Sequence, residues 1–237
     1  MPRKPALIFL PGLLCDAALW QPQIDRFGPQ FEILVADLTR DDSLRGMAGR
    51  LLASAPPRFA LAGLSMGGYV AQEILREAPH RVSRAALLNS SARPDSAEQT
   101  ARRRALIKLA QTGKFKGVTP RLLPLLIHPA RLADPALTGI VMAMAERVGQ
   151  AAFLRQQNAI LNRPDGRPDL ARVGCPALVV CGREDALTPP ALSREIADAI
   201  ADARLLELEE CGHLSSLEQP ELINRAFEDW LAPELAE

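Results

Sequence analysis

Short apolar runs alternate with longer stretches of helical periodicity along most of this chain, and this alternation is its most restrictive feature. The runs are apolar throughout rather than alternately polar, and strands of that kind are buried on both faces. The pattern therefore predicts an α/β fold in which a mostly parallel sheet of about six strands is flanked by helices. The expected strands are Ala6–Leu10, Phe31–Ala36, Phe59–Ala62, Ala85–Leu88, Ala177–Cys181 and Leu205–Leu208.

The alternation is interrupted between residues 92 and 173, where no clear strand is found. Apolar residues there recur at helical spacing in three segments, Ala101–Gln111, Thr138–Val148 and Gln150–Leu161. Open α/β sheets bind their ligands outside the carboxyl ends of the strands, where such an insertion would cover the site. We therefore predict an α/β core formed by residues 1–91 and 174–237, and a helical cap formed by residues 92–173.

The composition and net charge of the chain limit the kinds of molecule that we expect it to bind. Of the 237 residues, 48% are hydrophobic and 24% are charged, which suits one globular α/β domain. Lys plus Arg and Asp plus Glu both total 28, so nothing favours a nucleic-acid or anionic-membrane surface. The first apolar run, Ala6–Leu10, is too short for a signal peptide or a membrane span. We expect a cytoplasmic protein that acts on a small, neutral molecule; its oligomeric state is left open.

The cysteines and histidines give little support for a disulfide framework or a metal centre. Cys175 and Cys181 would lie roughly 20 Å apart on one extended strand, too far for a disulfide. The sequence contains no Cys-x-x-Cys pair, and its three histidines form no metal-binding motif. We expect free thiols, no metal and no cofactor, and we interpret Cys15 and Cys211 as packing residues rather than nucleophiles.

The segment FALAGLSMGG, residues 59–68, is a predicted strand that runs into a Gly-x-Ser-x-Gly motif and then into a helix from about Tyr69 to Glu77. A serine at such a sharp turn is held with its hydroxyl exposed, while the flanking Gly63 and Gly67 let neighbouring chain pass closely. The following helix directs its positive end to where an oxyanion would form. Taken alone, the motif fits a glycine-rich turn as well as it fits a nucleophile at Ser65.

An acid and a histidine follow later strands in the order that this nucleophile requires. A serine hydroxyl needs a base, and the base needs an orienting acid. The acidic pair Glu184 and Asp185 ends one predicted strand, and His213 comes directly after the last one. All three loops belong to the carboxyl edge of the sheet, so the side chains can converge there. At this point the residues themselves leave Glu184 and Asp185 as alternatives.

In combination, these motifs resemble the α/β-hydrolase superfamily, and most of all its small bacterial esterases, enol-lactonases and related carboxylic ester hydrolases. The resemblance extends over the chain apart from the less diagnostic cap. The spacing Gly182-x-x-Asp185-x-x-x-Pro189 is similar to the acid loop of the family. Gly212-His213 followed by Glu218-Gln219-Pro220 is similar to its histidine loop.

The resemblance implies a role for each site residue. Ser65 would be the nucleophile, His213 the general base, and Asp185 rather than Glu184 the orienting acid. It also implies an oxyanion hole formed by two backbone N–H groups. One belongs to Met66, and the other belongs to Leu13 in the loop after the first strand, with Leu14 as the alternative donor.

We therefore expect a serine hydrolase that cleaves a small carboxylic ester, lactone or thioester through an acyl-enzyme. The same triad could serve carbon–carbon bond hydrolysis or cofactor-free perhydrolase chemistry, because one fold hosts many reactions. A non-catalytic ligand-binding protein is the third interpretation, and the intact triad argues against it. Arg155, Arg163 and Arg167 could recognise a substrate carboxylate, although solvated arginines are the favoured interpretation.

Overall fold

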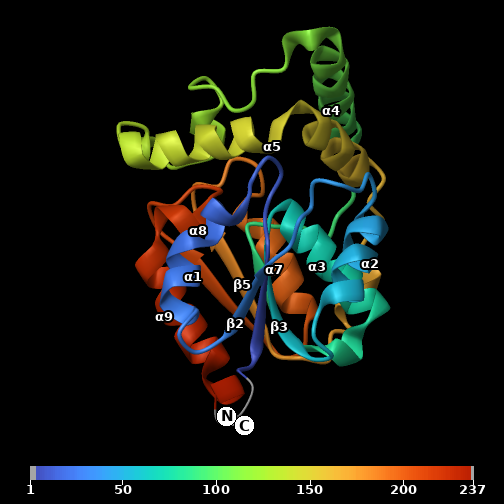
Figure 1. Ribbon diagram of the computed structural model, residues 1–237, viewed down its shortest axis with the longest axis vertical. Coiled ribbons are helices and arrows are strands. Elements are labelled where there is room, and N and C mark those ends of the chain that lie inside the picture. The colour runs from blue at the N-terminus through green and yellow to red at the C-terminus, as the bar shows by residue number, and fades with distance from the viewer. Residues whose placement is uncertain (1–3, 236–237) are drawn as a thin grey trace.

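The computed structural model describes residues 4–235 and contains a six-stranded sheet between two layers of helices (Figure 1). All neighbouring strands pair in parallel, in the order β2-β1-β3-β4-β5-β6. The α/β fold predicted from the alternation is therefore confirmed. The strands are β1 (Ala6–Leu10), β2 (Glu32–Val35), β3 (Phe59–Leu64), β4 (Val82–Leu88), β5 (Ala177–Gly182) and β6 (Ala203–Leu208).

Each predicted strand is present, and the differences lie at strand ends. The largest is in β4, which begins at Val82 rather than Ala85. Ser83 and Arg84 interrupt the apolar run there, so the sequence pattern excluded them. Pairing with β3 overrides the pattern, since Arg84 stands opposite Ala60 in the ladder.

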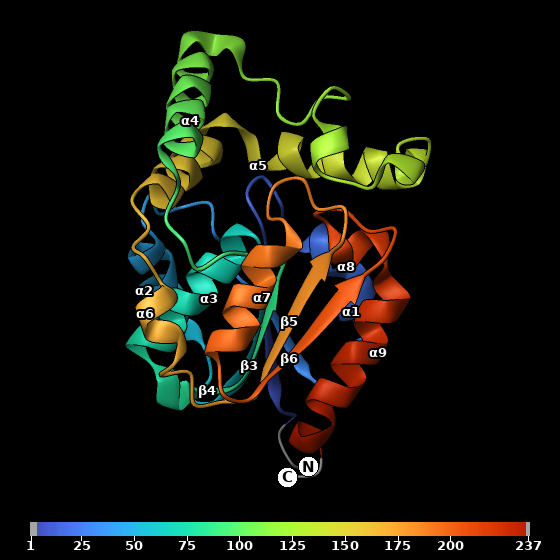
Figure 2. The same cartoon turned by 180° about the vertical axis from the view of Figure 1, so that it is seen from behind.

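Helices cover both faces of the sheet (Figures 1 and 2). Successive residues of β1 explain why its run is apolar throughout: Ile8 packs in one core cluster and Phe9 in the other, and both are fully buried. On the second face, Phe9 stacks on Trp20 with ring centroids 4.8 Å apart. The helices of the two layers are α2 (Leu44–Ser54), α3 (Met66–Glu77) and α7 (Pro190–Ala199) on one face, and α1 (Gln21–Phe27), α8 (Ser215–Glu218) and α9 (Pro220–Leu231) on the other.

The chain between β4 and β5 rises above the carboxyl ends of the strands (Figure 1). It contains α4 (Ala97–Leu109) and α5 (Pro135–Leu161), with short turns between them. Residues 97–161 are called the cap below. The last helix before β5, α6 (Arg167–Leu170), lies instead beside α7 and the core (Figure 2). The division into a core and a cap of residues 92–173 therefore stays a prediction.

Helix α5 is kinked at Gly149, whose φ of 74° and ψ of 175° are not helical. This backbone conformation is essentially restricted to glycine, so the residue type explains why the kink is there. The kink falls between the two predicted segments, Thr138–Val148 and Gln150–Leu161. It gives the second half of α5 its own direction across the top of the sheet (Figure 1).

Short helical turns complete the part of the chain that is described. They are Ala17–Trp20, Pro79–Arg81, Ala110–Lys114, Leu123–Leu125, Pro129–Arg131 and Ala232–Leu235. Across residues 4–235, no helix has both the length and the apolar character needed to cross a membrane.

Candidate active site

Ser65 occupies a strained backbone position between β3 and α3. Its φ of 55° and ψ of −114° are rarely adopted by L residues. The backbone is fixed on both sides, because Ser65 N donates to the carbonyl of Leu88 (2.9 Å) and Ser90 Oγ donates to the carbonyl of Ser65 (3.0 Å). A half-buried serine hydroxyl is thereby held at the carboxyl edge of the sheet.

The tight turn at Ser65 depends on the absence of side chains at two flanking positions. A Cβ at Gly67 would overlap the carbonyl oxygen of Leu10, and a Cβ at Gly63 would overlap that of Gly67. Both obstacles are backbone atoms, which cannot rotate aside. The two glycines of the motif are therefore required by packing as well as by the turn.

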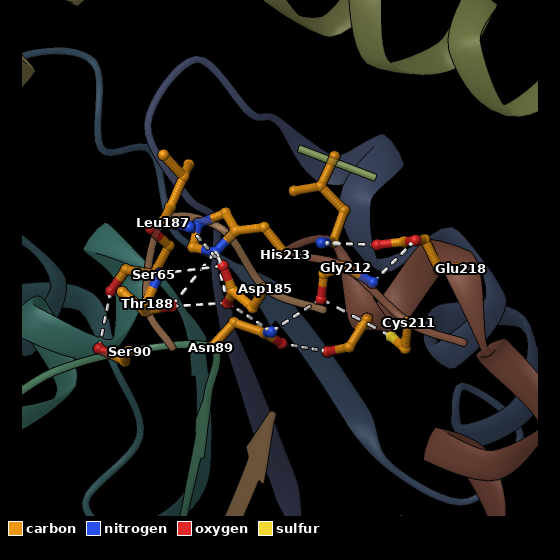
Figure 3. Close-up of polar contacts among 12 residues, drawn as sticks. Ser65, Asn89, Ser90, Asp185, Leu187, Thr188, Cys211, Gly212, His213 and Glu218 are labelled. Carbon is orange, nitrogen blue, oxygen red and sulfur yellow. Dashed lines mark hydrogen bonds and ion pairs between the residues drawn. The ribbon is translucent and has the colours of Figure 1, made fainter. Parts of the chain in front are cut away.

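The imidazole of His213 faces the carboxylate of Asp185 (Figure 3). Its Nδ1 lies 2.8 Å from Oδ2 and 3.0 Å from Oδ1, and both side chains are buried. An acid at Nδ1 leaves Nε2 as the ring atom that can take up a proton. The carboxylate of Glu184 has a different partner, because its Oε2 accepts the N–H of Cys211 (3.0 Å).

The carboxylate of Asp185 also accepts hydrogen bonds from its own loop. Leu187 N and Thr188 N donate to Oδ1 at 2.9 Å, and Thr188 Oγ1 donates to Oδ2 at 2.7 Å. Burial alone would raise the pKa of Asp185, but the charge of His213 and the hydrogen bonds from His213 and Thr188 outweigh it. Together they lower the pKa of Asp185 to about 2, so the group is ionised at neutral pH.

Asn89 belongs to this network, although no sequence motif pointed to it. Its side chain is fully buried, and Nδ2 donates to Asp185 Oδ2 (2.9 Å) and to the carbonyl of Gly212 (3.1 Å). Ser215 Oγ donates to its Oδ1 (2.5 Å). A buried amide thus ties the acid loop to the histidine loop (Figure 3). The available signal was a polar residue placed directly after an apolar strand at the carboxyl edge.

Ser65 and the His213–Asp185 pair are attached to the same end of β4. Leu88 and Ser90 bond the backbone of Ser65, and Asn89 between them bonds Asp185. Within residues 4–235, no hydrogen bond links the Ser65 hydroxyl to His213. Such bonds are often long in enzymes without substrate and tighten when the substrate binds.

The two predicted oxyanion donors lie on either side of Ser65. Met66 is the first residue of α3, so its N–H has no acceptor within the helix. Gly12 brings the loop after β1 close, because a Cβ there would lie 3.6 Å from Ser65 Cβ. In that loop, Leu14 N donates to Gln156 Oε1 (3.1 Å), whereas Leu13 N has no acceptor within residues 4–235. Of the two alternatives, Leu13 is the one with a free N–H.

Glu218 fixes the loop around His213 from the other side. This buried carboxylate accepts the N–H groups of Gly212 (3.0 Å), Leu214 (3.0 Å) and His128 (2.6 Å). Burial raises the pKa of Glu218, and these hydrogen bonds only partly oppose it. The side chain of His128 caps a turn by accepting Ala130 N (3.2 Å).

The cysteines have the features of packing residues. All four are free thiols. Burial raises the pKa of Cys15 to about 12 and also raises that of Cys211, so neither thiol readily forms the reactive thiolate. Among residues 4–235, no group of three or more His, Cys, Asp or Glu side chains is arranged to hold a metal ion.

The sequence favoured solvated side chains for Arg155, Arg163 and Arg167. This prediction is wrong for Arg163, which is buried. Its Nη1 lies 2.7 Å from Asp95 Oδ1, and its guanidinium carbon lies 4.4 Å from the ring centroid of Tyr69. The ion pair and the aromatic ring compensate the buried charge. Arg167 pairs with Asp165 in an exposed turn, as expected of a solvated residue.

Comparison with known proteins finds a matching family model and several relatives of similar sequence. A model of a family described as "Alpha/beta hydrolase family" matches residues 7–226. BpoC of Mycobacterium tuberculosis, provisionally named a non-heme bromoperoxidase, is 33% identical over 179 residues, covering 73% of this chain and 67% of that protein. The 3-oxoadipate enol-lactonase 2 of Acinetobacter baylyi is 27% identical over 244 residues, covering 95% and 88%.

The fold is also found among solved structures. The enol-lactonase from Burkholderia xenovorans LB400 superposes with a TM-score of 0.88 at 24% identity. The match covers 98% of this chain and 92% of that one. The whole arrangement, cap included, is therefore similar to that of a known enzyme.

Proposed function

Because this chain belongs to the alpha/beta hydrolase family, we propose that it is a serine hydrolase that cleaves a small, neutral carboxylic ester or lactone. The observation that carries the proposal is the His213–Asp185 pair, with Nδ1 2.8 Å from Oδ2, beside a serine held at a strained turn. The enol-lactonase relative supports the choice of substrate, since a lactone is a cyclic ester.

In the first half of the reaction, Ser65 Oγ attacks the ester carbonyl while His213 Nε2 takes the hydroxyl proton. Asp185 stabilises the imidazolium that forms. The negative charge on the former carbonyl oxygen is stabilised by the N–H groups of Met66 and Leu13 and by the positive end of α3. The carbon–oxygen bond of the ester then breaks, and the leaving alcohol takes the proton from His213.

In the second half, water attacks the acyl group on Ser65. His213 removes a proton from this water and returns it to Ser65 Oγ as the acyl–serine bond breaks. The carboxylic acid leaves, and the enzyme regains its starting protonation state. Each interaction that stabilises the first oxyanion is used again, so loss of one donor slows both halves, typically by roughly 100- to 1000-fold in kcat.

Substitution of the nucleophile tests the proposal. We expect Ser65→Ala to fold normally and to lose hydrolysis of p-nitrophenyl acetate by about a million-fold, as for comparable triads. Ser54→Ala is the control and should keep full turnover, because Ser54 is the last residue of α2 and its Oγ donates to the carbonyl of Leu51 in the same helix. Turnover that persists in Ser65→Ala would reject the assignment.

A second candidate reaction uses hydrogen peroxide in place of water, and the relationship to BpoC favours testing it. Peroxide attack on the acyl-enzyme would release a peracid, which can oxidise bromide without any heme. The test measures bromide oxidation with peroxide and acetate. Activity that depends on Ser65 and exceeds ester hydrolysis would favour this reaction over simple hydrolysis.

We also propose that the protein works in the cytoplasm. The support comes from the four cysteines, all of which are free thiols. Free thiols persist in reducing compartments, whereas proteins of oxidising compartments commonly pair them.

A further inference from the structure

One residue of the cap contacts the loop that carries an oxyanion donor. Gln156, in the second half of α5, is fully buried. Its Oε1 accepts Leu14 N (3.1 Å), and its Nε2 donates to the carbonyl of Leu38 (3.1 Å). Leu14 follows β1 and Leu38 follows β2, so one amide joins the cap to two neighbouring loops. Both ribbon views show the loop after β1 reaching up to α5 (Figures 1 and 2).

The conformation of Leu14 needs this support. Its φ of 59° lies in the left-handed region, which is unfavourable for a leucine. The turn around it is closed by a single backbone hydrogen bond, from Cys15 N to the carbonyl of Gly12 (3.1 Å). Gln156 supplies the acceptor for the Leu14 N–H inside that turn. Without it, a buried N–H would lack a partner, and the turn would be free to relax.

The side chain of Leu14 is held by the cap as well. It is 7% exposed and packs in a cluster with Ala110, Ala145 and Phe153, all of which are cap residues. Two further contacts attach helix α5 to the loops after β1 and β2. Arg147 pairs with Asp16 (2.7 Å), and Arg155 donates to the carbonyl of Thr39 (2.7 Å). Both the backbone and the side chain of Leu14 are thus positioned by α5 and its neighbours.

We propose that Gln156 is a positioning residue that orients the Leu13 N–H by holding the adjacent Leu14 peptide, so that the oxyanion hole is complete only with the cap docked. The inference rests on the proposed hydrolase function. The Leu14 N–H belongs to the peptide unit between Leu13 and Leu14, whereas the Leu13 N–H belongs to the unit before it. The two units meet at the Leu13 Cα, so fixing the second one restricts the orientation of the first. Gln156 also accepts the N–H of Leu14, so Leu13 is the residue of this pair whose N–H can donate to the oxyanion.

Gln156→Met tests the role, because methionine has a similar volume but can form neither hydrogen bond. We expect kcat for p-nitrophenyl acetate to fall about 10- to 100-fold, somewhat less than complete loss of an oxyanion donor. KM should stay within about three-fold, since the ground-state ester makes little use of the donor. Affinity for an alkylboronic acid, which mimics the tetrahedral oxyanion, should fall in parallel with kcat.

Gln157→Met is the matched control. Gln157 is the next residue of the same helix and is equally buried, but its Oε1 accepts Arg103 Nη1 (2.8 Å) within the cap. We expect it to lower the melting temperature as much as Gln156→Met while leaving kcat within about three-fold. Equal losses of kcat in the two variants, or a change confined to KM, would overturn the role of Gln156. If Gln156→Met does not fold, Gln156→Asn, whose amide is one methylene too short, is measured against Gln157→Asn.

The outcomes separate this inference from the proposed function. Ser65→Ala is assayed in the same series. If Ser65→Ala keeps its turnover, the hydrolase assignment itself fails. If Ser65→Ala is inactive while Gln156→Met keeps full kcat and full boronic-acid affinity, only the positioning role is rejected.

Discussion

Asp185 and Glu184 are adjacent acids with different surroundings, and the difference supports the proposal that Asp185 orients His213. Asp185 bonds the imidazole of His213 and also accepts from Asn89 and Thr188. Within the described part of the chain, Glu184 accepts only a backbone N–H, that of Cys211. The sequence left both acids open until the family resemblance was considered, because side-chain direction in a loop is set by contacts from other segments.

We expect Asp185→Asn to lower kcat by about 10,000-fold, because an amide does not hold the imidazole in the required tautomer. Glu184→Gln is the matched control, with the same chemical change on the neighbouring residue, and should stay within about ten-fold. Steady-state hydrolysis of p-nitrophenyl acetate measures both. A larger loss in Glu184→Gln than in Asp185→Asn would reverse the assignment.

Asn89 should contribute strongly to stability, because its buried amide bonds three residues on two loops. We expect Asn89→Ala to lower the free energy of unfolding by about 2–3 kcal/mol, since buried partners are left without hydrogen bonds. Asn162→Ala, an exposed position at the end of α5, should change it by less than about 0.5 kcal/mol. Urea unfolding compares the two, and equal effects would argue against the network.

At the scale of elements, the strands were predictable because both faces of the sheet are covered, so that each strand is an uninterrupted apolar run. The polar start of β4, Ser83 and Arg84, was missed for the same reason. The loops that carry the proposed triad could be picked out because each follows a strand within a recognisable motif. The roles of Asn89 and Gln156 could not be predicted, because their hydrogen-bond partners are distant in the chain. Asn89 bonds Gly212, 123 residues away, and Gln156 bonds Leu14, 142 residues away.

The turn between β3 and α3 makes a prediction at this scale. Gly67→Ala should lower the free energy of unfolding by more than about 3 kcal/mol or prevent folding, because the new Cβ would overlap the backbone at Leu10. Gly49→Ala, at an exposed and uncrowded position in α2, should instead raise stability by up to about 1 kcal/mol. Thermal unfolding distinguishes them, and a Gly67→Ala protein as stable as the wild type would refute this packing account.

For the molecule as a whole, the site is assembled from the core sheet and the cap together. The proposed nucleophile, base and acid come from loops of the sheet, whereas α5 contacts the loop that carries the second proposed oxyanion donor. The resemblance to α/β hydrolases is confirmed by the family match over residues 7–226. The insertion was recognisable from its loss of strand pattern, but the contacts that dock it depend on side chains that meet only in the folded state.

The low pKa of Asp185 makes global stability depend on pH. A carboxyl whose folded pKa is about 2, below its unfolded value near 4, stabilises the fold when ionised. That contribution is fully present above about pH 4 and is lost as the pH falls towards 2, by roughly 2 kcal/mol in all. Urea unfolding of wild type and Asp185→Asn between these pH values should converge by that amount. Parallel curves would show that Asp185 does not carry this dependence.

The most direct test of the account is to find which atom reacts with a fluorophosphonate, a reagent that traps activated serines. Peptide mass mapping should locate a single adduct on Ser65, and labelling should be lost in His213→Ala, because the hydroxyl then has no base. An adduct on any other residue, or unchanged labelling of Ser65→Ala, would contradict the assignment of this site.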